Sequence, residues 1–150
     1  MKARILLIAL AVLAFVSCKE KELTPLEPET ANYLGTVTVV YNDSSFDNDS
    51  IEVAFNPSED GLSGSVTIYK IRFVPQMPVT IDVTVPNLAM AATPEKIVLS
   101  CEQVVPFAMG GEFPRYTVTD FRGEIVGKEL SFSLNFGDYP TSFRGSRLIE

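Results

Sequence analysis

The sequence predicts an all-β protein: an antiparallel up-and-down barrel of about eight strands, with a two-sheet sandwich as the alternative. Three observations lead to this fold class. Apolar and polar residues alternate with a period of two over most of the chain beyond residue 32. Prolines fall between the alternating segments or at their ends, where a missing backbone N–H is tolerated. Segments follow one another closely in chain order, which is typical of a meander, and none has a sustained period of 3.6.

Residues 1–17 are typical of a signal peptide. Lys2 and Arg4 precede an apolar run, Ile5–Val16, of 12 residues. That run is shorter than the ~20 residues that cross a bilayer, but it suits the core of an export signal. The block Phe15–Cys18 resembles the lipobox of bacterial lipoproteins, in which the cysteine is lipidated and becomes the new N-terminus. We therefore expect lipidation at Cys18, with an ordinary secretory signal as the alternative.

The chain beyond the signal divides into two parts. Residues 18–32 are polar, of mixed charge and contain Pro25 and Pro28, so we expect a flexible tether between the lipid and the fold. Residues 33–150 form the predicted barrel domain. With Cys18 lipidated, Cys101 has no partner for an intramolecular disulfide, and its phase predicts a small core residue. The expected location is the bacterial cell envelope, at the outer membrane, on its periplasmic or its surface face.

The strands are predicted from the alternation and from their β-branched residues. In chain order they are Thr36–Tyr41, Ile51–Phe55, Ser65–Val74, Val79–Val85, Lys96–Val105, Tyr116–Val126, Leu130–Phe136 and the closing strand Thr141–Ile149.

Four local features are expected between or within these strands. The apolar phase of Ser65–Val74 shifts midway, which predicts a β-bulge near Tyr69-Lys70 or a strand covered on both faces. The mixed pattern of Tyr116–Val126 predicts a bend at Gly123. Gly127-Lys128 suits a tight hairpin turn. Asn87–Thr93 is the one stretch that we expect to be helical.

Composition excludes several kinds of partner and chemistry. All 19 acidic but only 10 of the 12 basic residues follow residue 17, so the exported chain carries a net charge of −9. That charge argues against nucleic acid and against electrostatic docking on anionic lipid. The absence of histidine removes Ser-His-Asp and Cys-His catalysis and His-ligated zinc sites. We expect no cofactor and no enzymatic activity.

Two groups of acidic residues are weighed as sites. Catalysis by a pair of carboxylates, as in glycosidases, needs both in one cleft. The pairs that we consider, and interpret as surface carboxylates, are Glu102 with Glu112 and Asp120 with Glu124. Asn42–Ser50 offers oxygen ligands for calcium but lacks the glycine and glutamate spacing of an EF-hand, so we expect a solvated hairpin loop and no metal.

The segment Pro106–Pro114 is the most informative predicted loop. It carries Phe107, Met109 and Phe113 around a flexible Gly110-Gly111 pair. These apolar side chains could form a lid over a ligand at the barrel mouth, or they could fold back and cap the barrel end themselves. Three further apolar residues that we expect in loops, Met77, Leu88 and Met90, would favour the lid if they lie at the same end.

Several segments together resemble the calycin-like lipoproteins of bacteria, a group related to the lipocalins. They are Tyr33-Leu34-Gly35, Ile68–Phe73, Phe121–Ile125 and Leu130-Ser131-Phe132, and the likeness runs from Tyr33 to the C-terminus. The Gly-x-Trp signature of true lipocalins is absent, because the chain has no tryptophan. The resemblance implies an eight-stranded antiparallel barrel with an interior able to take a small hydrophobic ligand.

Two functions follow as hypotheses. The first is a lipid-anchored envelope barrel that binds a small apolar ligand. The second is a non-catalytic structural or interaction subunit of an envelope or surface protein complex. An apolar cavity of ~300 Å³ or more would favour the first. A filled interior beside an exposed apolar patch would favour the second.

Overall fold

The computed structural model of the chain describes residues 24–148. The predicted signal peptide, Cys18 and the final residues of the predicted closing strand lie outside this range. Among the described residues there is no α-helix, and so none long and apolar enough to cross a membrane.

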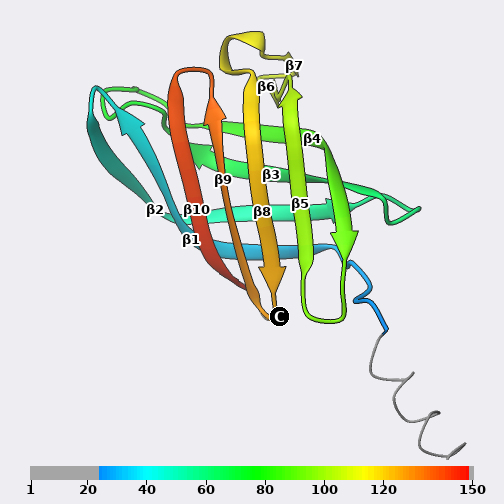
Figure 1. Cartoon of the computed structure of the whole chain (residues 1–150). Helices are drawn as coiled ribbons and strands as arrows, with labels where there is room; N and C mark the ends of the chain where they lie inside the picture. Colours follow the sequence, from blue (N-terminus) through cyan, green and yellow to red (C-terminus); the bar gives the residue numbers. More distant parts are fainter. Residues whose placement is uncertain (1–23, 149–150) are drawn as a thin grey trace, which may run out of the picture.

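Residues 24–148 contain ten strands and one short 3-10 helix (Figure 1). The elements are β1 (Ala31–Tyr41), β2 (Ser44–Pro57), β3 (Ser63–Ile71), β4 (Ile81–Ala92), β5 (Ile97–Val104), β6 (Phe107–Ala108), β7 (Gly111–Glu112), the 3-10 helix η2 (Pro114–Tyr116), β8 (Val118–Val126), β9 (Glu129–Phe136) and β10 (Tyr139–Arg147).

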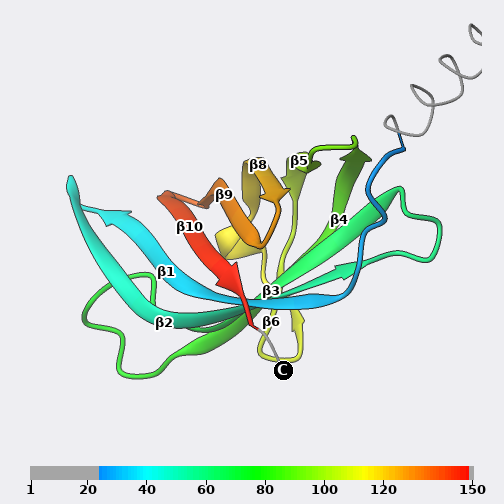
Figure 2. The same ribbon diagram turned by 90° about the horizontal axis from the view of Figure 1, so that it is seen from below.

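Eight of the strands close into one antiparallel barrel. The order around the ring is β3-β2-β1-β10-β9-β8-β5-β4, and β4 pairs back with β3 to close it. This closure confirms the predicted barrel and excludes the sandwich. In Figure 1, β5, β8, β9 and β10 run steeply across β1, β2 and β3, and Figure 2 shows the two groups of strands facing each other. The β6–β7 hairpin is additional to the eight ring strands. β6 pairs with Val83 and Thr84 near the start of β4, on the edge that pairs with β5 further along the strand.

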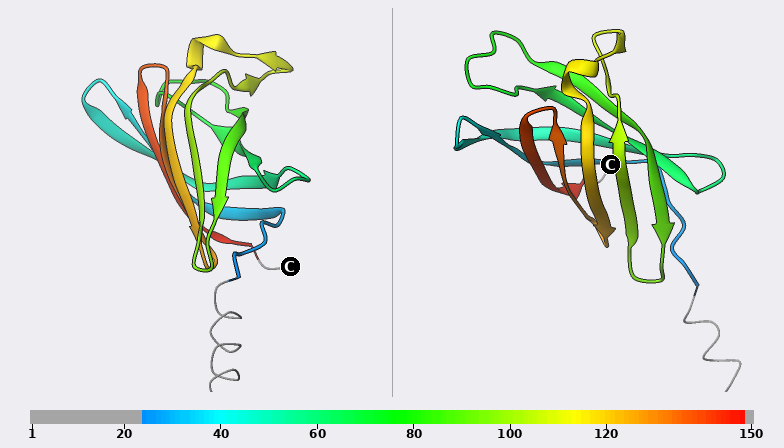
Figure 3. Two further views of the ribbon diagram at one scale, coloured as in Figure 1. Left: turned by 45° about the vertical axis from the view of Figure 1, so that its right-hand side comes forward. Right: turned by 45° about the horizontal axis from the view of Figure 1, so that its top comes forward.

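The two ends of the barrel carry different segments (Figure 3). The β6–β7 hairpin and η2 lie at one end, which we call the upper end. Residues 24–30 lie at the other end, near the β4–β5 turn. We call this the anchor end, because the chain enters the barrel there. β1 begins at Ala31, two residues before the predicted domain boundary.

The prediction of a helix over Asn87–Thr93 is wrong. The segment continues β4, and Ala89 to Ala92 pair with β5. Alanine, leucine and methionine favour helices in isolation. Here the strand ladder to β5 and the burial of Leu88 and Met90 in the core outweigh that weak preference.

The predicted loop Asn42–Ser50 is also mostly strand. Only Asn42 and Asp43, both with positive φ, form the turn, and β2 begins at Ser44. A two-residue turn with two positive φ values suits the twist of paired strands, so β1 and β2 can extend up to it as a long hairpin.

The structure confirms the bulge and the hairpin turn but moves the bend. The β3–β4 register shifts between Ile68 and Ile71, around the positive φ of Lys70. Gly127 lies in the predicted tight turn. Gly123 pairs regularly with both neighbouring strands. The irregularity lies instead at Asp120, whose positive φ shifts the register and produces the mixed apolar pattern.

Candidate functional site

The barrel interior is filled by its own side chains. The inward residues of β9, namely Leu130, Phe132, Leu134 and Phe136, are all at most 4% exposed. The ring of Phe132 stacks between those of Phe121 and Phe143, with centroids 5.1 and 5.2 Å apart. Bulky residues on facing strands of an eight-stranded barrel leave little room for a ligand. The hollows considered below accordingly lie on the outer surface or at an end.

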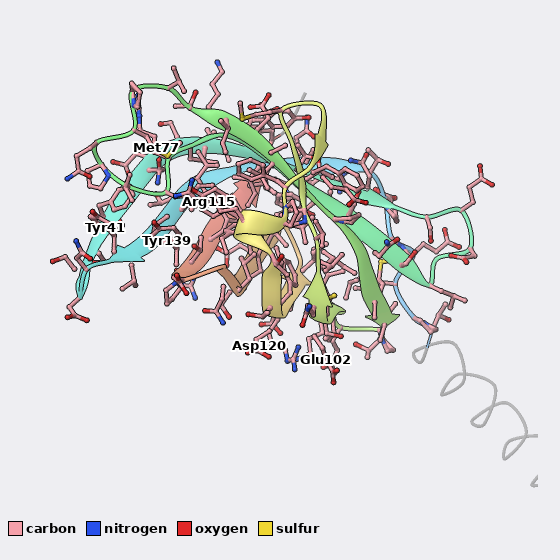
Figure 4. The ribbon with its side chains drawn as sticks, turned by 90° about the horizontal axis from the view of Figure 1, so that it is seen from above. Tyr41, Met77, Glu102, Arg115, Asp120 and Tyr139 are labelled. Atoms are coloured by element: carbon pink, nitrogen blue, oxygen red, sulfur yellow. The ribbon has the colours of Figure 1, made fainter. Side chains whose placement is uncertain are left out.

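The upper end is closed by an aromatic cluster. The β3–β4 loop inserts Phe73, which is fully buried, and its ring stacks on Tyr116 of η2 at 4.3 Å. Tyr139 at the start of β10 lies 6.1 Å from Phe73, ring to ring. Met77 supports the loop, because its Sδ accepts a hydrogen bond from the N–H of Phe73 at 3.1 Å. Figure 4 shows Met77, Tyr139 and Arg115 gathered at this end.

The predicted lid residues divide between two places. Phe113 packs on Tyr116 at 5.1 Å and so joins the aromatic cluster. Phe107 and Met109 lie on the β6–β7 hairpin outside the ring, where their side chains are 45% and 78% exposed. Of the three further residues weighed for a lid, Met77 lies at the upper end, but Leu88 and Met90 are core residues of β4. The loop that closes this end is therefore mainly the one carrying Phe73.

The exposed side chains on the hairpin belong to an apolar patch. Val79, which precedes β4, is 61% exposed and borders the same hollow as Phe107 and Met109. We call Val79, Phe107 and Met109 the hairpin patch. The hollow has a volume of about 670 Å³ and is floored by Gly110-Gly111 and the start of β4. Among its lining residues Asp82 is the only charged one.

Sequence reasoning found the hairpin half of this patch but not Val79. Val79 continues the alternation of the strand that follows it, which placed it in the core of the predicted strand. In the structure β4 begins two residues later, at Ile81. Its exposure depends on where the β3–β4 loop ends, for which the alternation gives no signal.

The anchor end holds a smaller pocket of about 290 Å³. Its apolar walls include Tyr33, Phe55 and Ile97, and the N-terminal segment lies across it. The N–H of Leu26 donates to the carbonyl of Thr93 at 3.0 Å. Because these contacts hold the N-terminal segment to the barrel, the fixed part of the chain begins inside the range predicted as tether.

Charged side chains also hold the N-terminal segment at this end. Arg147 of β10 forms an ion pair with Glu29 at 3.3 Å. Burial raises the pKa of the Tyr33 hydroxyl and Glu29 raises it further, while Arg147 acts in the opposite direction. The neutral form of Tyr33 is therefore favoured here.

Neither of the two carboxylate pairs that we considered for catalysis lies together in a cleft. Glu102 and Asp120 are exposed on the neighbouring strands β5 and β8 (Figure 4). Glu112 is exposed on β7, and Glu124 forms an ion pair with Lys96 at 3.2 Å.

The described residues include no group of three or more acidic or cysteine side chains that could hold a metal ion. In the predicted loop, Asp47 and Asp49 accept hydrogen bonds from the hydroxyls of Thr38 and Thr36 instead. Cys101 is partly buried on β5 and packs against the core.

No protein-family model, curated protein or solved structure matches the chain. The fold therefore rests on the strand pairing of this chain alone.

Proposed function

We propose that the protein is a lipid-anchored β-barrel of the cell envelope that acts as a non-catalytic interaction subunit and binds another protein through the hairpin patch. One observation carries the proposal: the interior is filled, while Val79, Phe107 and Met109 expose apolar side chains together on the outside. Exposed apolar patches on a small domain are typical of contact sites for other proteins. A carrier of apolar ligands would instead need an open apolar interior.

Lipid on Cys18 would orient this surface. Seven residues separate Cys18 from Leu26, so the eight steps between their Cα atoms span at most about 29 Å. The anchor end would thus stay close to the outer membrane, while the hairpin patch at the upper end would face away from it. The closed eight-stranded meander also supports our proposal that the chain is related to the calycin-like lipoproteins.

The chemistry of the surroundings indicates the kind of partner. Asp82 borders the hairpin patch, and Glu112 follows Gly111 on β7. The exported chain as a whole carries a charge of −9. A protein with an apolar contact surface rimmed by basic side chains complements this arrangement, since opposite potentials favour encounter and disfavour a second acidic copy.

Site-specific photo-cross-linking in the native host tests the proposal. A benzophenone side chain replaces Met109 in the full-length protein, and a matched control replaces Lys128, an exposed residue in the turn at the anchor end. We expect a discrete adduct from position 109 and none of that size from position 128. The adduct should disappear when Phe107→Asp and Val79→Asp are added. No adduct at position 109, or the same adduct from both positions, would contradict the proposal.

A further inference from the structure

A second surface, unrelated to the hairpin patch, lies on the outer face of five neighbouring strands. It is a hollow of about 610 Å³ across β1, β10, β9, β8 and β5, which we call the outer groove. Two rows of outward residues cross it. One row runs through Thr36, Arg144, Ser131 and Glu124. The other runs through Thr38, Ser142, Ser133 and Arg122.

The shape of the outer groove follows from these rows. The central strand β9 contributes the short side chains Ser131 and Ser133. The strands on either side of it carry the arginines, Arg144 on β10 and Arg122 on β8. Since neighbouring strands lie about 4.8 Å apart, five strands give a track of about 19 Å, and the two rows lie about 7 Å apart. A track of this length suits an extended polar chain better than a single small ion.

The outer groove concentrates positive charge on an acidic protein. It contains Lys96, Arg122 and Arg144, three of the 10 basic residues that follow residue 17. Lys96 is paired with Glu124, and Arg122 donates from Nη1 to the carbonyl of Phe121 at 2.8 Å. Neither ion pair within residues 24–148 includes Arg144. Its guanidinium fork is therefore available to bind a carboxylate through two parallel hydrogen bonds.

Five serine and threonine hydroxyl groups also line the outer groove. Each serine or threonine hydroxyl both donates and accepts, as the hydroxyls of a sugar do. The aromatic residues at its floor, Phe132 and Phe143, are at most 4% exposed, so they offer no face on which a nucleobase could stack. Asp47 and Asp49, bonded to the two threonines, lie along one edge and disfavour a densely charged anion.

We propose that the outer groove binds an acidic oligosaccharide, a chain of sugar units that bear spaced carboxylate groups. Arg144 binds one carboxylate, Arg122 assists at a second position, and the serine hydroxyls bond to the sugar hydroxyls between them. This role is independent of the hairpin patch, which lies on different strands. Each can therefore fail without the other.

Calorimetric titration of the full-length protein with an oligogalacturonate chain tests the proposal. We expect binding that weakens about tenfold in Arg144→Gln and in Arg122→Gln, because a hydrogen bond to a charged group is worth roughly that factor. The matched control Lys128→Gln, at the anchor end, should bind as the unmodified protein does. Circular dichroism of each variant verifies the fold, and the second arginine keeps the test valid if one variant is unstable.

Two further probes distinguish the contribution of the carboxylates from that of the sugar hydroxyl groups. The methyl ester of the same oligosaccharide has no free carboxylates and should bind at least about tenfold more weakly. A polyglutamate peptide has carboxylates without sugar hydroxyls and should also bind more weakly. The proposal is overturned by absence of oligogalacturonate binding, by equal binding of the ester, by tighter binding of polyglutamate, or by unchanged binding in both arginine variants.

Discussion

Phe73 is the residue on which the closure of the upper end depends most. Its ring contacts aromatic residues from three other segments, including Tyr116 at 4.3 Å and Phe136 at 5.0 Å, and it is fully buried although it lies in a loop. Apolar side chains from loops can occupy the end of a barrel where a ligand would otherwise bind. Phe73 therefore links the local loop structure to the absence of an open mouth.

We predict that Phe73→Ala lowers the free energy of unfolding by about 3–5 kcal/mol, because it deletes a buried ring and leaves a cavity that the barrel cannot collapse. Urea unfolding followed by circular dichroism measures the change. Phe107→Ala, which truncates a phenylalanine that is 45% exposed, is the control and should cost less than about 1 kcal/mol. Equal losses for the two variants would mean that Phe73 does not hold the upper end.

Tyr33 is expected to make the free energy of unfolding depend on pH in the alkaline range. Burial raises the pKa of its hydroxyl above the ordinary value of 10.0, so above that pH the unfolded chain releases the proton first. Since the native state then binds more protons, the free energy of unfolding should fall as pH rises from 10.0 through the pKa of the folded state. The stabilising effect is fully present below pH 10.0.

Urea midpoints measured across this alkaline range check the prediction. Tyr33→Phe should make the fall shallower, while Tyr69→Phe, which alters an exposed tyrosine, should leave it unchanged. If both variants lose stability as steeply as the unmodified protein, Tyr33 is not the group responsible.

At the scale of the element, two glycines let β1 and β10 cross closely. Gly35 and Gly145 are direct partners in the ladder. A Cβ on Gly35 would lie 2.0 Å from the backbone oxygen of Arg144, and one on Gly145 would lie 2.5 Å from the Phe143 ring. The register of β1 with β2 shifts just after Gly35. Glycine at these positions therefore permits the sharp turn of the barrel wall.

We predict that Gly145→Ala destabilises the protein by about 1–3 kcal/mol, because the added methyl group would overpack against the Phe143 ring and the backbone oxygen of Leu34. Gly111→Ala on the β6–β7 hairpin is the matched control. A Cβ there has no neighbour within 4 Å, so the change should stay within about 0.5 kcal/mol. Thermal unfolding midpoints measure both, and a Gly145→Ala protein as stable as the control would show that the strands can separate without loss.

At the scale of the whole molecule, the filled interior predicts that the barrel holds no separate apolar ligand. Native mass spectrometry of the protein purified from its own host should detect the processed chain with its N-terminal lipid and no additional apolar mass. The reason is that large buried side chains already occupy the barrel. Retention of a separate hydrophobic molecule would contradict this and return weight to the carrier hypothesis.

The proposed membrane attachment depends on one residue, Cys18. We predict that Cys18→Ala moves the protein from the membrane fraction to the soluble fraction, because alanine has no thiol to which the lipid could be attached. Fractionation followed by immunoblotting measures this distribution. The hairpin patch should be unaffected, so cross-linking from position 109 separates loss of the anchor from loss of the fold. A Cys18→Ala variant that stays in the membrane fraction would contradict the lipid anchor.

The sequence by itself determined that this chain is all-β and antiparallel, because alternation with a period of two records which face of each strand is buried. It favoured a barrel over a sandwich, but only the pairing of β4 with β3 decided between them. It also located the bulge at Lys70 and the turn at Gly127, where phase and glycine carry a local signal. It did not determine that Asn87–Thr93 extends β4, since pairing with β5 outweighs local helix preference.

Only the tertiary structure decided what closes the barrel and what stays outside. Phe73 was predicted in a strand and Phe107 in a loop. In the structure both lie outside the eight ring strands, yet Phe73 is buried and Phe107 is 45% exposed. Likewise, the residues of the outer groove come from five strands, and only the register aligns their hydroxyls and arginines. Alternation distinguishes the inward from the outward residues of each strand. The contacts between residues of different strands depend on ring closure and on the packing of the long loops.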